Sequence, residues 1–153
     1  MKLNEFLVKA KIATYADEEN AKKKTLEDGS TELIFEIDDY KYRDRYFGSN
    51  PFVGQEIVWK NNELIWCMNY FGRVNENLIS KEKVYTFLKK CLKKVDKKAP
   101  FRGHSFFKEG NFEYFNEFSG YIADFNGSEK ILFNKKQIYV LDYHGGSLNL
   151  NNI

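Results

Sequence analysis

Hydrophobic and polar residues alternate in short segments along most of the chain, and this period of two predicts β-strands. In one such segment Trp66, Met68 and Tyr70 share a face, while Cys67 and Asn69 point to the other face. Asn, Asp and Gly residues separate the segments at positions typical of hairpin turns. The predicted strands are residues 31–37, 40–47, 52–60, 63–71, 105–108, 111–119, 125–133 and 137–144.

Two other segments have a helical pattern. The first helix is predicted from an Asn4 cap to about Ala13, and the second follows Ser80, which is a good N-cap residue. The second helix has apolar residues at helical spacing on one side. They are Val84, Leu88, Cys91, Leu92 and Val95. Residues 81–98 are otherwise rich in Lys, which we interpret as a solvated face, with an acidic or nucleic-acid partner as the alternative.

An internal repeat is the most informative feature of the sequence. Residues 52–72 and 125–145 align without a gap, and 7 of the 21 aligned positions are identical. The identical pairs are Phe52/Phe125, Gly54/Gly127, Glu56/Glu129, Asn61/Asn134, Ile65/Ile138, Tyr70/Tyr143 and Gly72/Gly145. The repeat predicts an α+β fold built from two units, about 4–73 and 80–146, each a helix followed by an antiparallel meander, related by a pseudo-twofold axis.

The two units are expected to form one domain over residues 1–153, because a half of this size would bury too little surface alone. The last strand of each unit is largely apolar on both faces, so we expect both faces to be covered. We expect the helices to cover one face. The other face should be covered by a sheet or a partner chain, or should line a ligand cavity. Residues 17–30 are predicted to form a solvated loop, because they are rich in Lys, Glu, Gly and Ser.

Composition and charge narrow the function classes. The chain has 24 basic and 22 acidic side chains, so the net charge of +2 gives no argument for a nucleic-acid partner. It has no apolar run of about 18 residues and a charged N-terminal segment, which predicts a cytoplasmic protein that does not enter the membrane. With two His and two Cys at no ligand spacing, neither a metal site nor a cofactor is predicted.

Two glutamates are candidates for chemistry. Glu56 and Glu129 occupy the same place in the two repeats, within strands where a carboxylate needs partners. We favour a structural interpretation, in which each Glu carboxylate forms charge-assisted hydrogen bonds with an Arg or with Tyr hydroxyls. The alternative is an enzyme in which Glu56 or Glu129 acts with His144 in acid/base catalysis. His144 replaces Phe71 of the first repeat and precedes two glycines, so it is the best single polar candidate.

The predicted function is non-enzymatic binding of a small molecule, as a sensor or a sequestering protein. Only 4 of the 24 basic side chains are Arg, and each Arg lies beside an aromatic residue or a Gly. A guanidinium in this setting can bind a flat ligand that is anionic or aromatic, and a nucleotide-like molecule is one possibility. The candidate ligand-binding residues are Arg43, Asp44, Asn69, Tyr70, Arg73, Arg102, Tyr143, His144 and Gly145. A protein-interaction domain, with a homodimer as one form, is the third hypothesis.

The chain resembles a bacterial family, domain-of-unknown-function family 5680. The resemblance is carried by TYA, YKYRDRYFG, FVGQE, IWCMNYFGR, FRG, FNGSEKI and YHGG, in this order. Members of the family occur alone or fused behind an XRE-type helix-turn-helix, so the resemblance implies a sensory or ligand-binding module. His104 departs from the family pattern, which often has Pro after Arg-Gly, and no such helix-turn-helix precedes the domain in this sequence.

The resemblance also implies which positions belong to the family pattern. They are Asp44, Tyr46, Gly54, Glu56, Trp66, Met68, Asn69, Tyr70, Gly72, Arg102, Gly103, Gly127, Glu129, His144, Gly145 and Gly146.

Overall fold

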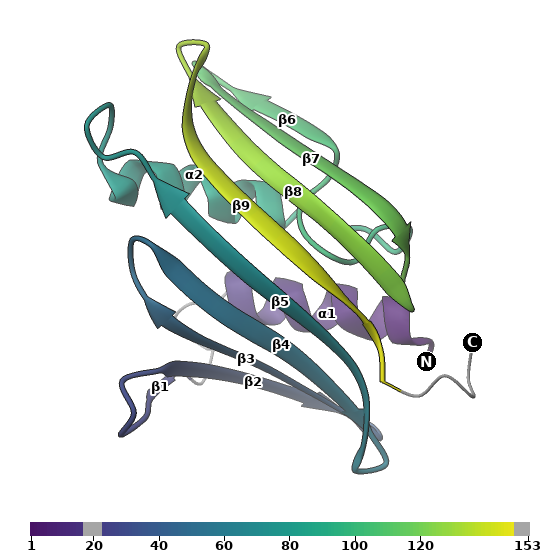
Figure 1. The fold of residues 1–153 in the computed structure, drawn as a ribbon. Helices are drawn as coiled ribbons and strands as arrows, with labels where there is room; N and C mark the ends of the chain where they lie inside the picture. Colours follow the sequence, from purple (N-terminus) through teal and green to yellow (C-terminus); the bar gives the residue numbers. More distant parts are fainter. Residues whose placement is uncertain (17–22, 149–153) are drawn as a thin grey trace.

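A computed structural model describes residues 1–16 and 23–148, and within these ranges the chain forms two helices and one nine-stranded antiparallel sheet (Figure 1). The helices are α1 (Leu3–Ala16) and α2 (Lys81–Leu92). The strands are β1 (Lys24–Thr25), β2 (Thr31–Ile37), β3 (Tyr40–Gly48), β4 (Phe52–Lys60), β5 (Glu63–Val74), β6 (Phe106–Glu109), β7 (Phe112–Tyr121), β8 (Asp124–Phe133) and β9 (Lys136–Ser147). The α+β class predicted from the sequence is confirmed.

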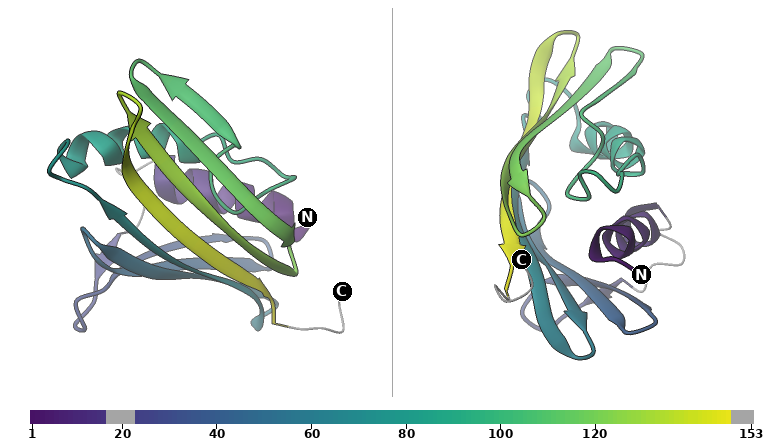
Figure 2. Two further views of the ribbon diagram at one scale, coloured as in Figure 1. Left: turned by 45° about the horizontal axis from the view of Figure 1, so that its top comes forward. Right: turned by 90° about the vertical axis from the view of Figure 1, so that its right-hand side faces the viewer.

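The strand order is β1-β2-β3-β4-β5-β9-β8-β7-β6, so β5 and β9 pair at the centre of the sheet. In this central pair Tyr70 lies opposite Tyr143. The sheet is strongly curved, and both helices lie on its concave face (Figure 2). No helix in the described part of the chain is long and apolar enough to cross a membrane.

The hairpin turns follow the sequence signals. Asn61 and Asn62 have φ angles of 49° and 66°, and Asn134 and Lys135 have the same two values. Two successive residues with positive φ match the right-handed twist of the flanking strands and favour a two-residue turn. Short polar side chains such as Asn tolerate this backbone region, which explains why these hairpins were visible in the sequence.

Three local predictions were wrong. Asn4 does not cap the first helix, because α1 begins at Leu3 and includes it. α2 ends at Leu92, not at Val95, because the Lys94 and Val95 N–H groups bond to carbonyls three residues earlier, which tightens the last turn. The predicted loop 17–30 contains β1, whose Lys24 pairs with Glu32. Residues 17–22 of that loop lie outside the described residues.

The helix-facing side of the sheet is tightly packed around tyrosines. The Tyr70 ring lies over Gly54 of β4, and the Tyr143 ring lies over Gly127 of β8. A Cβ atom added at Gly127 would lie 2.4 Å from Tyr143 Oη and 2.7 Å from the Glu117 carbonyl oxygen. These positions therefore need glycine because rings from the neighbouring strands occupy the space of a side chain.

Gly127→Ala is expected to lower the free energy of unfolding by about 1–3 kcal/mol, the usual cost of overpacking a core. Urea denaturation of the variant measures the change. Ser128→Ala, at the exposed neighbouring position, is the matched control and should change stability by less than about 0.5 kcal/mol. Equal effects of the two substitutions would contradict the close packing.

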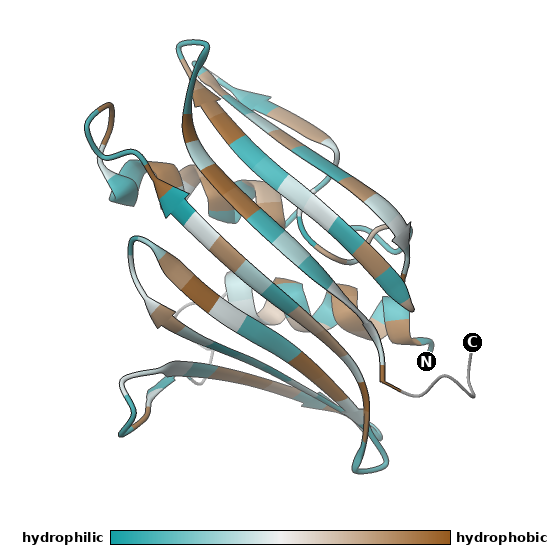
Figure 3. Ribbon diagram, in the orientation of Figure 1, coloured by the Kyte–Doolittle hydropathy of each residue, from teal (hydrophilic) through white to brown (hydrophobic). Residues whose placement is uncertain are grey.

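The other face of the sheet is not covered by this chain: within residues 1–16 and 23–148, no element lies against it (Figure 2), so of the predicted covers a second sheet of the same chain is not found there. Hydrophobic and hydrophilic positions alternate along the strands (Figure 3), and the outward set includes polar side chains. Gln55 Nε2 donates to Asn69 Oδ1 at 2.8 Å, and Asn69 Nδ2 lies 3.3 Å from His144 Nε2. These polar pairs satisfy one another at the water-facing surface.

Candidate functional site

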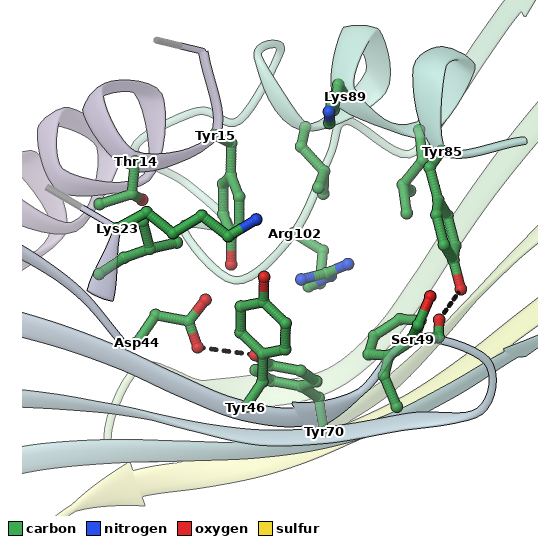
Figure 4. A pocket seen from close by; sticks show the side chains of 14 residues that line it. Thr14, Tyr15, Lys23, Asp44, Tyr46, Ser49, Tyr70, Tyr85, Lys89 and Arg102 are labelled. Carbon is green, nitrogen blue, oxygen red and sulfur yellow. Dashed lines mark hydrogen bonds between the residues drawn. The ribbon is translucent and has the colours of Figure 1, made fainter. Parts of the chain in front are cut away.

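A cavity of about 320 Å³ lies between the two helices and the half of the sheet formed by β2 to β5 (Figure 4). Polar side chains from α1, β3, β5 and the loop after α2 meet apolar ones from β2, β4 and α2. The lining residues are Thr14, Tyr15, Lys23, Leu33, Asp44, Tyr46, Ser49, Phe52, Tyr70, Tyr85, Leu88, Lys89, Leu92 and Arg102.

A buried ion pair joins α1 to the sheet beside the cavity. Lys11 is 1% exposed and pairs with the fully buried Glu56, and its Nζ also donates to the Phe101 carbonyl oxygen at 2.7 Å. Tyr15 Oη donates to Glu56 Oε1 at 2.8 Å. Burial lowers the pKa of Lys11, while the adjacent Glu56 carboxylate opposes that shift. The pair therefore anchors α1 and leaves Glu56 fully occupied.

A second buried ion pair anchors the loop after α2. Arg102 donates to Glu129 Oε1 from Nη2 at 2.5 Å and from Nε at 3.1 Å. Tyr139 Oη donates to the same oxygen at 2.7 Å, and Tyr114 Oη donates to Glu129 Oε2 at 2.5 Å. Of the two readings of the glutamates, these contacts match the structural one, in which Arg and Tyr hydroxyls satisfy the carboxylate.

Asp44 is the third buried carboxylate of this region. It is 2% exposed, lies opposite Glu56 in the β3–β4 pair, and accepts a hydrogen bond from Tyr70 Oη at 2.7 Å. Burial, and next the negative charge of Glu56, raise the pKa of Asp44 to about 7. Within residues 1–16 and 23–148, Lys11 pairs with Glu56 and Arg102 pairs with Glu129, and no ion pair to Asp44 is formed.

The guanidinium of Arg102 connects its ion pair to the cavity. Its central carbon lies 5.7 Å from the centre of the Tyr70 ring and 5.9 Å from that of Tyr15. The flanking backbone is held in place, because the Gly103 N–H donates to Tyr114 Oη at 3.0 Å. Figure 4 shows Arg102 pointing into the cavity, with Asp44 and the Tyr15 hydroxyl pointing toward the same space.

The structure brings together three of the nine residues predicted to bind a ligand, namely Asp44, Tyr70 and Arg102. Tyr143 is buried elsewhere and donates to Asn116 Oδ1 at 2.8 Å. Gly145 packs against the backbone of β5.

The remaining predicted ligand-binding residues lie away from the cavity. Arg43 is half-buried, 3.9 Å from a Glu32 carboxylate oxygen and above the Trp59 ring. Arg73 is exposed, and Asn69 faces His144 on the open side of the sheet. Alternation along the strands explains the separation, because neighbours in sequence point to opposite faces.

The acid/base arrangement that the enzyme hypothesis requires is not assembled. Glu56 and Glu129 are at most 1% exposed and point toward the helices. His144 follows the inward-facing Tyr143 and is exposed on the opposite face. The sheet therefore lies between the imidazole and both carboxylates.

Several residues in or beside the cavity were missed from the sequence. Lys11 carried a signal: it lies between Leu7 and Thr14 at helical spacing, so a cation sits on the buried face of α1. A buried Lys needs a carboxylate partner, which pointed to an acidic residue elsewhere in the core. Tyr15 and Tyr85 carried no signal, since Tyr is intermediate in its tendency to be buried and either placement fits a helix.

Comparisons with known proteins give one match. No curated protein and no solved structure matches the chain. A family model matches residues 44–148, which include Asp44, Tyr70, Arg102, Glu56 and Glu129 but not α1. Because the match covers more than half of the 153 residues, the chain belongs to the family described as Domain of unknown function (DUF5680).

Proposed function

We propose that the protein binds a small molecule in the cavity above β2 to β5 and acts as a sensor or a sequestering protein, without catalysing a reaction. The observation that carries the proposal is a preformed cavity in which a buried carboxylate, Asp44, and a buried guanidinium, Arg102, face the same space. Desolvated polar groups that converge in an otherwise apolar cavity are typical of ligand sites.

The cavity lining supports an anionic or aromatic ligand. Lys23 and Lys89 contribute positive charge to the lining, whereas Arg102 is paired with Glu129 and lies with Asp44 at the inner wall. Rings of Phe52 and Tyr70 pack edge to face at 6.1 Å and supply flat apolar surface. The volume of about 320 Å³ lies at the small end of the range for ligand pockets, which supports a metabolite-sized ligand.

The proposal includes an ancestral duplication of the helix-and-meander unit. The opposition of Tyr70 and Tyr143 in the central strand pair supports it, as does the packing of each ring over a Gly of the neighbouring strand. The partners of these two tyrosines differ: Tyr70 binds Asp44, whereas Tyr143 binds the neutral Asn116. In this proposal the ligand lies beside Tyr70 and its charged partner Asp44, and not beside Tyr143.

A protein-interaction domain is the second candidate, favoured by one observation on the open face of the sheet. Phe47, Val53 and Phe71 are register neighbours on β3, β4 and β5, and each is 43–45% exposed. A row of exposed apolar side chains is suited to contact with another protein. A shift of oligomeric state on Phe71→Lys, measured by light scattering, would support this candidate.

A metabolite screen by thermal shift tests the binding proposal. A ligand at 100 times its dissociation constant should add about 2.7 kcal/mol to the free energy of unfolding. Leu88→Trp, which fills the cavity from α2, should abolish the shift, while Leu78→Trp, at a position 46% exposed and outside the cavity, should retain it. A shift of the same size in both variants would place the ligand elsewhere.

A further inference from the structure

Building on the proposed function, we infer that the ligand is a guanine-type nucleotide, whose adjacent N–H donors bind Asp44, whose ring carbonyl faces Arg102 and whose phosphate lies toward Lys23. The inference concerns the chemical class of the ligand. Three independent features of the cavity lead to it: the charge balance at its inner wall, its aromatic surfaces, and the lysines in its lining.

The inner wall requires hydrogen-bond donors from the ligand. Glu56 and Glu129 have Lys11 and Arg102 as ion-pair partners, whereas from the described residues Asp44 receives one hydrogen bond, from the neutral Tyr70 hydroxyl. Figure 4 shows one Asp44 oxygen bonded to Tyr70 and the other pointing toward the middle of the cavity. These three buried carboxylates thus outnumber the two buried cations Lys11 and Arg102. A ligand that brings N–H donors or a positive charge would stabilise the ionised Asp44 side chain.

Arg102 adds a donor beside this acceptor. Both residues line the cavity, and the positive charge of Arg102 acts on the Asp44 carboxylate. The wall therefore presents a carboxylate next to a guanidinium. Guanine has the complementary edge, with an amino group, a ring N–H and a carbonyl side by side. Adenine lacks the carbonyl and the ring N–H, and uncharged sugars lack the planar arrangement.

The other two features fit the rest of a nucleotide. Tyr46, Phe52 and Tyr70 line the same cavity and offer ring surfaces to a flat heterocycle. Lys23 is exposed, and in Figure 4 its side chain extends over the cavity opposite Tyr46. A lysine ammonium is a common phosphate-binding group, so the charged end of the nucleotide would lie there.

Isothermal titration calorimetry with three mononucleotides and one nucleoside tests the inference. Guanosine monophosphate should bind about 10- to 100-fold more tightly than inosine monophosphate, which lacks the amino group, and than adenosine monophosphate. Guanosine, which lacks the phosphate, should bind more weakly than guanosine monophosphate. In Lys23→Gln the two should bind with equal affinity. Equal binding of guanosine, inosine and adenosine monophosphates would overturn the inference.

Asp44→Asn provides a test that loss of folding cannot mimic. An amide offers one acceptor and one donor, so the variant should lose affinity for guanosine monophosphate and gain affinity for xanthosine monophosphate, which has a carbonyl in place of the amino group. Asp142→Asn, the same chemical change at an exposed site on the other face, should keep the guanine preference. An unchanged guanine preference in Asp44→Asn would overturn the inference.

The pH dependence supplies a further criterion. The charged or titratable groups around Asp44 are Lys11 and Tyr15 from α1, Glu56 from β4, Tyr70 from β5, and Arg102 and Lys23 from the flanking segments. N–H donors bind the ionised carboxylate, so the affinity for guanosine should rise as the pH increases to about 7 and level off above it. An affinity that falls over this range would indicate a ligand that binds protonated Asp44, and would overturn the inference.

Failure of the inference can be told from failure of the proposed function. If the metabolite screen yields a ligand that Leu88→Trp excludes but that is not of the guanine type, the binding function stands and the ligand class is wrong. If the screen, with guanosine monophosphate included, yields no ligand, both are wrong.

Discussion

Arg102→Met is expected to lower the free energy of unfolding by about 3–5 kcal/mol, because breaking a buried ion pair leaves an uncompensated charge in the core. Glu129 is 1% exposed, and Arg102 is its cationic partner. Met retains much of the apolar volume of Arg, so the loss reports mainly on the missing charge and donors. Urea denaturation at neutral pH measures the change.

The double variant Arg102→Met/Glu129→Gln distinguishes an unpaired charge from lost packing. The amide of Gln carries no charge and can still accept a hydrogen bond from Tyr139, so the double variant should regain a large part of the lost stability. Lys97→Met, which removes an exposed ion pair with Glu5, is the surface control and should cost less than about 1 kcal/mol. A double variant less stable than Arg102→Met would contradict this account.

Asp44→Asn is expected to raise the free energy of unfolding at about pH 8 by about 2–4 kcal/mol, since each pKa unit corresponds to about 1.4 kcal/mol. The ordinary pKa of the carboxyl is 3.8, and burial beside Glu56 raises the folded-state pKa to about 7. The folded protein must therefore carry an unfavourable buried charge at alkaline pH, and the amide removes this cost while it can still accept the Tyr70 hydrogen bond.

The sign of the pH dependence follows from the same shift. Between about pH 4 and about pH 7 the folded state binds more protons at Asp44 than the unfolded state does. The contribution of this group to the free energy of unfolding therefore falls as the pH rises through this range, and it stays constant above about pH 7. Thermal denaturation at several pH values should show this slope in the parent protein and a flatter profile in Asp44→Asn.

Asp142→Asn is the control for this prediction, because Asp142 is exposed on the open face. It should leave the pH profile of the parent protein unchanged. An Asp44→Asn protein that is less stable than the parent at about pH 8 would show that the carboxylate is favourably solvated or paired, and would contradict the assigned charge balance.

The strands, turns and fold class could be predicted from the sequence because their determinants are local. Side chains alternate with a period of two in any strand, so Trp66, Met68 and Tyr70 had to share a face before any partner strand was known. Asn61 and Asn62 tolerate positive φ, which marks a hairpin irrespective of its surroundings. The errors at the end of α2 and at β1 lie where hydrogen bonds and not side-chain pattern decide the boundary.

Only the tertiary structure decided which polar residues share a site. Lys11 and Glu56 are 45 positions apart, and Arg102 and Glu129 are 27 apart, so their pairing depends on how α1 and the loop after α2 dock on the sheet. The sequence established the chemistry available to the chain, including buried carboxylates and scarce arginines. It could not place His144 on the open face or Asp44 beside Arg102. Both faces of the central strands have similar hydrophobic patterns, so only the docking of the helices decides which face becomes the core.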